Sequence, residues 1–462
     1  MGGLSVRGTR PSRATPPLLA ASILAASILA CSGSSGLIFT PRPAPGTTPS
    51  APDTGAPTQP ATDTPLPATT TPGQPTFDGS PLPTLSTAPS TPGPVFEQLA
   101  GFPTDNALEV TGVTATPSGF TAVGFGAIAD EGYFGRRQGV VWTSTDGRTW
   151  SQSVDPALQF VTPRAVVALG NDVFVFGRFS TCPHLVYYSC TDAPDAGNAA
   201  WRSAGGGPWE RLAVPPQLQH GLIDDVAAGA DRLAVFGGAG VEQQTSAVWL
   251  TSDGINWAET TDLAGLDPVS ALAFGTTGVV ALGTSFVAVA EDIQLVAAFS
   301  TDGIHFMSAA APGLIGAAID GVAEGGSGFV GVGYETSEDV SLGGVALHSP
   351  DGMSWTQAGS SDDSFAGSVL IDVHDLSDGY VALGFKSSDG DFTVQDGRAW
   401  ISADGQSWRL LAPLGATFTH FGASALGPGG LVVFAADQQE VGYDDVESTI
   451  LGWFGPIDAL TP

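Results

Sequence analysis

The fold is set by the stretch Ser144-Thr145-Asp146-Gly147-Arg148-Thr149-Trp150, because its pattern Ser-x-Asp-Gly-x-x-Trp returns along the 462-residue chain. Later copies keep the aspartate and the glycine before an aromatic residue, and their aspartates are Asp253, Asp302, Asp351 and Asp404. A degenerate copy at 203–209 has Gly205 in place of the aspartate. The copies lie about 50 residues apart with strand-like sequence between them, which indicates a repeat architecture.

Each repeat contains a short run of β-branched or aromatic residues that is bounded by glycine, as expected of a buried strand. These runs lie at 120–125, 173–177, 233–237, 279–283, 329–333, 380–384 and 431–435. A shorter apolar strand precedes each run, and a third strand leads into the motif. The motif itself is a tight turn, in which the aspartate accepts backbone N–H bonds and the glycine takes positive φ. The aromatic residue then opens a fourth strand, so each repeat predicts a four-stranded antiparallel meander.

The seventh run has no motif after it, and the missing strand is found at the other end of the domain. Residues 96–100, Phe-Glu-Gln-Leu-Ala, resemble the fourth-strand residues 209–213, Trp-Glu-Arg-Leu-Ala. An N-terminal strand that completes the last sheet closes a ring and removes an exposed edge. The sequence therefore predicts an all-β fold over 95–462, a seven-bladed β-propeller closed by an N-terminal strand.

The first 31 residues have the character of an export signal. Arg7, Arg10 and Arg13 precede an apolar stretch at 18–30, which is too short to remain as a membrane-spanning helix. Residues 28–33 resemble a bacterial lipobox, in which the cysteine is lipidated, although Leu29 is larger than usual there. We expect lipidation at Cys31 and an extracytoplasmic protein anchored to the cell membrane; the alternative is an ordinary secretory signal.

Composition separates a linker from the domain. Residues 32–94 are rich in Pro, Thr and Ser, with 16 prolines after residue 40, and such a segment is expected to be disordered. The formal net charge of −31 argues against a nucleic-acid partner. A solvated acidic surface and a surface for cations or a basic partner both remain open.

Cys182 and Cys190 are expected to form a local disulfide, and the alternative is a metal site that includes His184.

The repeated motif resembles the Asp-box, or BNR repeat, of sialidases and of many non-enzymatic propellers, among them photosynthesis assembly factors. The resemblance covers most of 96–462. It implies that the box is a peripheral turn between the third and fourth strands, and that its aspartates are structural. It also implies that ligands meet the loops between second and third strands and the connections between blades.

Candidate ligand-face residues lie at or just before the predicted inner strands, where they would line a central channel: Arg164, His220, Asp224, Asp320, Asp372 and His420. Asp225 belongs to the same region. The loops between second and third strands are acidic, and carboxylates gathered there would suit Ca²⁺ or a basic partner. Asp389, Asp391 and Asp396 resemble part of a calcium-binding loop but lack the full twelve-residue pattern. Calcium is the one cofactor considered; none is otherwise expected.

The resemblance does not extend to the sialidase catalytic residues. That family carries an Arg-Ile-Pro segment, two further arginines that grip a carboxylate, a Tyr–Glu nucleophile pair and an Asp acid. This chain has no Arg-Ile-Pro, and Arg164 is the one arginine placed at a connection into an inner strand. Without a bidentate carboxylate clamp the sialidase mechanism has no anchor.

We therefore expect a monomeric, non-enzymatic binding or interaction module for a protein, a glycan or a cation. Two alternatives stay open: a sialidase-like or other carbohydrate-active hydrolase, and an assembly or stability factor that resembles the photosynthesis-associated propellers. Other glycosidases need just two carboxylates at a suitable separation, a requirement that so acidic a chain meets too easily to count.

Overall fold

The computed structural model describes residues 94–127, 137–181, 196–240, 245–287, 292–335, 343–360, 363–387, 394–440 and 446–462, all within the unit Gly93–Pro462. The predicted signal, linker and lipidation site at Cys31 lie outside these residues. So do the predicted disulfide between Cys182 and Cys190 and two of the calcium candidates, Asp389 and Asp391.

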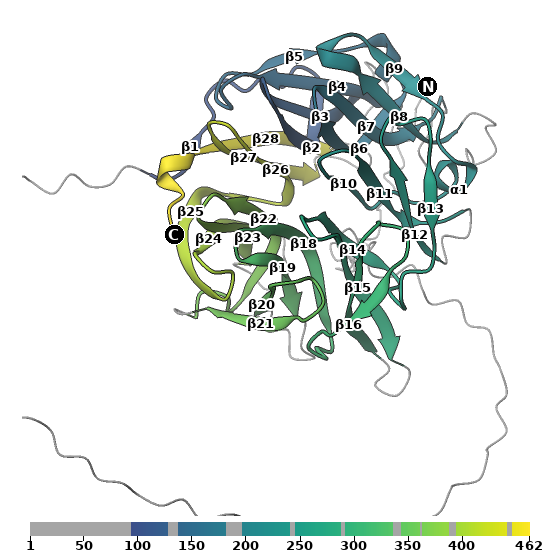
Figure 1. Cartoon of the computed structure of the whole chain (residues 1–462). Coiled ribbons are helices and arrows are strands. Elements are labelled where there is room, and N and C mark those ends of the chain that lie inside the picture. Colours follow the sequence, from purple (N-terminus) through teal and green to yellow (C-terminus); the bar gives the residue numbers. More distant parts are fainter. Residues whose placement is uncertain are drawn as a thin grey trace, which may run out of the picture. The chain divides into compact units, whose positions relative to one another are not determined.

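The described strands form five four-stranded sheets and one eight-stranded sheet, and Figure 1 labels most of them. The first sheet holds β2 (Ala107–Thr116), β3 (Gly119–Ala127), β4 (Arg137–Ser144) and β5 (Ser151–Ser153). The second holds β6 (Val161–Leu169), β7 (Asp172–Phe179), β8 (Gly197–Ser203) and β9 (Trp209–Leu212). The third holds β10 (Asp225–Ala228), β11 (Leu233–Gly238), β12 (Ser246–Thr251) and β13 (Ala258–Thr260). The fourth holds β14 (Val269–Phe274), β15 (Val279–Val287), β16 (Asp292–Ser300) and β17 (Met307–Ala309).

The eight-stranded sheet consists of two four-stranded groups joined at their outer strands. One group is β18 (Ala317–Gly325), β19 (Gly328–Glu335), β20 (Gly343–Ser349) and β21 (Thr356–Ser360). The other is β22 (Ser368–Leu376), β23 (Gly379–Ser387), β24 (Gln395–Ser402) and β25 (Ser407–Phe418). The join is parallel and short, with Gly359 opposite Ser407 and Ser360 opposite Trp408. The pairs within each group are antiparallel.

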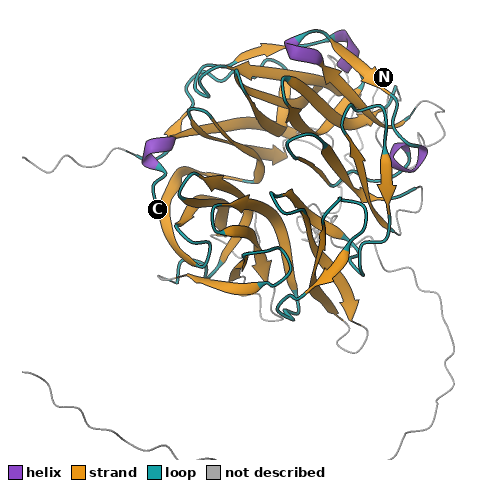
Figure 2. Ribbon diagram, viewed as in Figure 1, coloured by secondary structure: helices purple, strands orange, loops and turns teal. Residues whose placement is uncertain are grey.

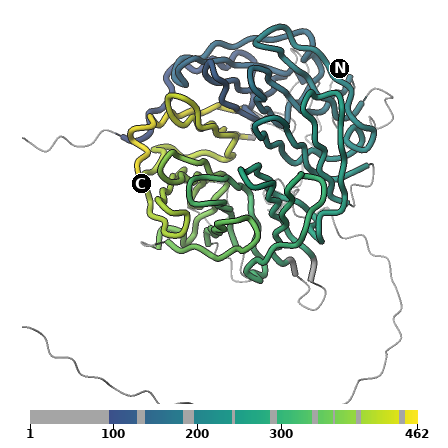
Figure 3. Tube along the Cα trace, in the orientation of Figure 1, coloured from purple at the N-terminus to yellow at the C-terminus, as the bar shows by residue number. Residues whose placement is uncertain are grey.

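The last sheet combines the two ends of the described chain. Its strands are β26 (His420–Gly427), β27 (Gly430–Glu440), β28 (Val446–Pro456) and the short β1 (Glu97–Gln98). β1 pairs antiparallel with β28, where Glu97 lies opposite Phe454 and Gln98 opposite Trp453. In Figure 3 the yellow C-terminal segment accordingly lies beside the purple start of the described chain.

Contacts between sheets run through their first strands. β2 contacts β6, β6 contacts β10, and the series continues through β14, β18, β22 and β26, which contacts β2. We call these seven the inner strands.

Helices are few and short in the described part of the chain, as Figure 2 shows: η2 (Pro156–Leu158), η3 (Ala204–Gly206), α1 (Pro216–Gln219) and η4 (Ile457–Ala459). None of the helices in the described part of the chain has the length and apolarity that a membrane crossing requires.

Apolar side chains fill the space between neighbouring sheets. The third strands contribute fully buried indoles, among them Trp142, Trp201, Trp249 and Trp400. In the first sheet the Nε1 of Trp142 donates to the carbonyl of Pro103 at 2.7 Å. Trp150 and Phe434 meet edge to face at 5.3 Å, which joins the first sheet to the last. The prediction of an all-β fold of four-stranded antiparallel sheets is confirmed, and the arrangement is consistent with a β-propeller.

Candidate functional site

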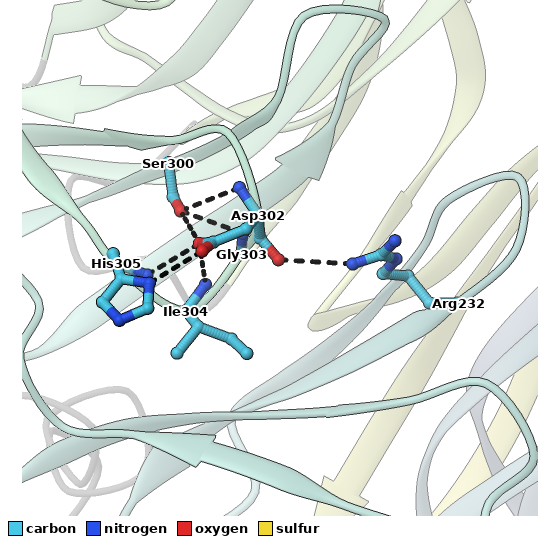
Figure 4. Close-up of polar contacts among 6 residues, drawn as sticks. All are labelled: Arg232, Ser300, Asp302, Gly303, Ile304 and His305. Carbon is cyan, nitrogen blue, oxygen red and sulfur yellow. Dashed lines mark hydrogen bonds and ion pairs between the residues drawn. The ribbon is translucent and has the colours of Figure 1, made fainter.

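Each intact Asp-box is a closed set of hydrogen bonds, and Figure 4 shows the copy around Asp302. The Ser300 hydroxyl donates to Asp302 Oδ1 at 2.9 Å and accepts from the Gly303 N–H at 2.9 Å. The N–H groups of Ile304 and His305 donate to the same Asp302 oxygen at 2.9 and 2.8 Å. Equivalent bonds surround Asp146, Asp253, Asp351 and Asp404. These carboxylates bind their own turns.

The backbone donors also set the charge of these aspartates. The N–H of His305, followed by its side chain, holds the pKa of Asp302 well below its ordinary value. The N–H groups of Thr149 and Arg148 lower the pKa of Asp146 in the same way. Asp302 also accepts from His305 Nδ1 at 2.7 Å, and its carbonyl accepts from Arg232 at 3.3 Å (Figure 4). An ionised carboxylate with its lone pairs occupied offers little to a ligand.

The degenerate copy obtains its carboxylate from another strand. The N–H of Gly205 donates to Asp172 Oδ1 at 3.0 Å, and Asp172 lies at the start of β7. Arg202 donates from its Nε to Asp172 Oδ2 at 3.0 Å. Asp172 thus braces the turn that lacks its own aspartate.

Most inner strands have a register shift at an equivalent position in their pairing with the second strand. Several predicted ligand-face residues lie at this position. Register shifts, the mark of a β-bulge, occur at this place in β2, β6, β14, β18, β22 and β26. Arg164 is the extra residue in β6 and Asp320 is the extra residue in β18. Asp224 holds the same place before β10, because Asp225 lies opposite Phe236 just as Ala165 lies opposite Phe176. A bulge re-aims a side chain, and Arg164, Asp224 and Asp320 are exposed.

The carboxylates of the inner strands influence one another. Burial raises the pKa of Asp224 to about 6, against the opposing charge of Arg164. Burial raises the pKa of Asp225 to about 7, and the negative charges of Asp372 and Asp224 add to this effect, whereas a hydrogen bond from the Val226 N–H opposes it. Water still touches Asp224 and Asp225, so the cause is crowding by surrounding protein atoms and not enclosure in a core. We call Arg164, Asp224, Asp225 and Asp372 the inner-strand cluster.

Asp320 lies on the strand next to that of Asp372, since a Cβ at its neighbour Gly321 would come within 2.9 Å of the Asp372 Cα. Burial alone raises the pKa of Asp320 to about 7. Burial, and then the charge of Asp320, raises the pKa of the neighbouring Tyr334 to about 12.

Asp372 is held by two residues that the sequence did not single out. Ser424 on β26 donates to Asp372 Oδ2 at 2.5 Å, and His374 Nε2 lies 2.7 Å from the Ser424 hydroxyl and 3.3 Å from the same Asp372 oxygen. Burial acts to raise the pKa of Asp372. The charge of His374 and the hydrogen bonds from His374 and Ser424 together have the larger effect, so the pKa is lowered. One imidazole nitrogen faces both partners, so the histidine does not stand between serine and aspartate as in a nucleophilic triad.

The two histidines predicted for the ligand face have different surroundings. His420 Nε2 lies 3.2 Å from Glu109 Oε1, which connects β26 to β2. This hydrogen bond, against some desolvation, raises the pKa of His420. His220 follows α1, is exposed, and makes no side-chain hydrogen bond within the described ranges.

The remaining calcium candidate, Asp396, forms an ion pair with Arg398. Asp396 Oδ2 accepts from Arg398 Nη2 at 2.9 Å. Within the portion of the chain that the structure covers, no group of three or more His, Cys, Asp or Glu side chains is arranged to hold a metal ion.

Comparisons with known proteins give distant likenesses of fold. No family model matches the chain, and no curated protein matches it either. Ycf48 bound to a D1 peptide is 12% identical, with a TM-score of 0.44 over 79% of this chain and 99% of the other. The sialidase of Trypanosoma rangeli in complex with sialic acid is 12% identical, with a TM-score of 0.41 over 80% of this chain and 60% of the other. A protein of unknown function from Dyadobacter fermentans is 13% identical, with a TM-score of 0.42 over 78% of this chain and 99% of the other.

Proposed function

We propose that residues 95–462 form a seven-bladed propeller, closed by β1, that acts as a non-enzymatic binding module. The seven four-stranded groups and the unbroken series of contacts between inner strands support this architecture. The pairing of Glu97 with Phe454 supports the closure. The lipobox-like sequence at Cys31 supports export and a lipid anchor, which mass spectrometry of the mature N-terminus would test.

The ligand that fits the inner-strand cluster is a cation. One observation carries the proposal: Asp225 lies under the influence of Asp224 and Asp372, which raise its pKa further after burial has done so. Carboxylates that repel each other in this way gain when a positive group comes between them. An ammonium or guanidinium group of a protein partner meets this need, whereas the described carboxylates form no group of three that could hold a metal ion.

Isothermal titration of the full chain with Ca²⁺ and with a lysine-rich peptide tests the proposal. We expect the peptide to bind more tightly than Ca²⁺, and we expect Asp225→Asn to weaken peptide binding about tenfold, since a hydrogen bond to a charged group contributes on the order of 1.5 kcal/mol. Asp231→Asn removes an equal charge outside the cluster and serves as the control. Binding that both variants reduce equally would show only the general acidity of the chain, and the proposal would fall.

One observation favours a carbohydrate-active hydrolase as the second candidate. The surroundings of Asp225 and Asp372 move their pKa values in opposite directions, which is how an acid and its partner carboxylate are set up in glycosidases. A panel of fluorogenic glycosides, including a sialoside, tests this reading. Turnover that is lost in both Asp225→Asn and Asp372→Asn would establish it over the binding module.

A further inference from the structure

A cleft of about 350 Å³ lies at the edge of the second sheet, away from the inner strands. It is lined by Asn198 and Ala199 of β8, by residues 211–214, and by Gln219 at the end of α1. Pairing between β8 and β9 ends at Ala200 and Leu212, so the chain leaves the sheet there and α1 forms the far side. This volume is at the lower end of the range for small-molecule sites.

Arg211 contributes a positive charge to this cleft. Its guanidinium stacks 4.2 Å from the ring centroid of Phe179 and 5.8 Å from that of Trp201. Among the described residues it makes no ion pair or hydrogen bond, and it is exposed. Stacking on aromatic rings fixes the plane of a guanidinium and leaves its N–H edge free for a bidentate acceptor.

The carboxylates nearest in sequence are directed elsewhere. Arg211 lies opposite Trp201, whereas Glu210 lies opposite Arg202, and neighbouring residues of a strand point to opposite faces. Asp172 is held by Arg202 on that other face. Among the residues that the structure describes, no carboxylate therefore pairs with Arg211 on the face that bears the cleft.

Two amide side chains complete the cleft. Asn198 donates from its Nδ2 to the carbonyls of Leu218 and Gly221 at 2.9 and 2.8 Å, which fixes the amide and directs its other end, Oδ1, away from those carbonyls. Gln219 lies over Gly197, where a Cβ would come within 3.1 Å of the Gln219 Cγ. A stacked guanidinium beside the fixed Asn198 amide and the amide of Gln219 suits a ligand that carries one carboxylate and several hydroxyls.

We propose that this cleft binds a hexuronate, with its carboxylate on Arg211 and its hydroxyls on Asn198 and Gln219. A single sugar ring matches the volume, and a guanidinium binds a carboxylate through two parallel N–H bonds. The site is separate from the inner-strand cluster and prefers the opposite charge, so neither proposal depends on the other.

Isothermal titration of the full chain with galacturonate, its methyl ester and galactose tests the site. We expect galacturonate to bind at least about tenfold more tightly than the ester or galactose, the effect of one charge-assisted hydrogen-bonded pair. The ester keeps the hydroxyls and removes only the charge, so this comparison needs no variant. Equal affinity for acid and ester, or binding of none of the three sugars, overturns the proposal.

The Arg211→Gln variant locates the effect, and Arg232→Gln is its control with the same loss of charge outside the cleft. We expect Arg211→Gln to abolish the preference for the acid and Arg232→Gln to keep it; a preference that survives Arg211→Gln overturns the assignment. Trigalacturonate distinguishes a polysaccharide from a free sugar as the source. Tighter binding than galacturonate indicates a polymer, and equal binding indicates the monosaccharide; either supports the site.

Discussion

Arg148 holds its guanidinium 3.9 Å from the ring centroid of Phe454, so the first Asp-box turn lies against the last sheet of the fold. The same guanidinium donates to Glu97 Oε2 at 3.3 Å, on the N-terminal strand that pairs with Phe454. Three segments far apart in the sequence therefore meet at one arginine.

Arg148→Ala should lower the free energy of unfolding by about 1 kcal/mol, because an exposed cation–π contact and an exposed ion pair each contribute less than that. Denaturant unfolding measures the loss. Arg232→Ala removes an ion pair with the sequence neighbour Asp231 and one hydrogen bond of 3.3 Å to the Asp302 carbonyl, and it should change the stability less. Equal losses in the two variants would contradict a role for Arg148 in joining the first and last sheets.

Gly147→Ala should destabilise far more than Gly205→Ala. Gly147 has φ of +73°, and a Cβ there would lie 2.6 Å from a ring carbon of Phe454. Gly205 has φ of +56° but open space around it. Left-handed strain alone costs about 1–2 kcal/mol and a steric clash about 1–3 kcal/mol more. Thermal and denaturant unfolding should therefore show a larger loss of stability for Gly147→Ala, by the free energy of the steric clash. Similar losses in the two variants would show that Phe454 moves aside.

The strands were predictable because their signals are local. The run at 120–125 lies within β3 (Gly119–Ala127) and the run at 431–435 lies within β27 (Gly430–Glu440). Each run is apolar and bounded by glycine, and a short continuous apolar run of this kind is typical of a buried strand whatever the surrounding sheet. The box turns follow from the same kind of signal, since the Asp302 carboxylate, within the described part of the chain, bonds only groups at most three residues away.

The polar contacts of the site were not predictable in the same way. Asp372 and His374 are two apart on a strand and so share a face, which is a signal that was missed. Ser424 reaches Asp372 from a strand 52 positions away, and no local pattern marks it. Asp172 supplies a carboxylate to Gly205 from 33 positions away. Such partners depend on how sheets pack, and a repeat pattern does not encode that.

His420→Gln should reveal a pH-dependent link between the last and first inner strands. Hydrogen bonding to Glu109 raises the pKa of His420, so its contribution to stability is complete below the unfolded-state value of about 6.5 and is lost as pH rises through the higher folded value. The wild type should exceed His420→Gln in stability near pH 5.5, and the difference should vanish by about pH 8.5. Glu109→Gln should show the same profile. A difference that persists unchanged across this range would mean that packing of the ring, and not its charge, is responsible.

Asp225→Asn should gain stability over the wild type as pH rises. The pKa of Asp225 is about 7 in the folded state, raised first by burial, and about 3.9 in an unfolded chain. The folded state therefore holds a proton that the unfolded state releases, and wild-type stability falls as pH rises from about 4 to about 7. Asparagine has no proton to lose, so the two proteins should be closest in stability near pH 4 and diverge until about pH 7, as thermal unfolding in a pH series would measure.

Asp231→Asn should behave in the opposite sense and is the matched control for this titration. The hydrogen bond from Arg232 lowers the pKa of Asp231, so its contribution is present above about pH 3.9 and is lost as pH falls through the lower folded value. The Asn variant should therefore lose stability against the wild type only as pH rises to about 3.9, and its difference from the wild type should stay constant from about pH 4 to pH 7, where Asp225→Asn gains stability. Parallel slopes in the two variants would show that net charge governs the pH dependence, and the crowding of carboxylates around Asp225 would then have no measurable effect.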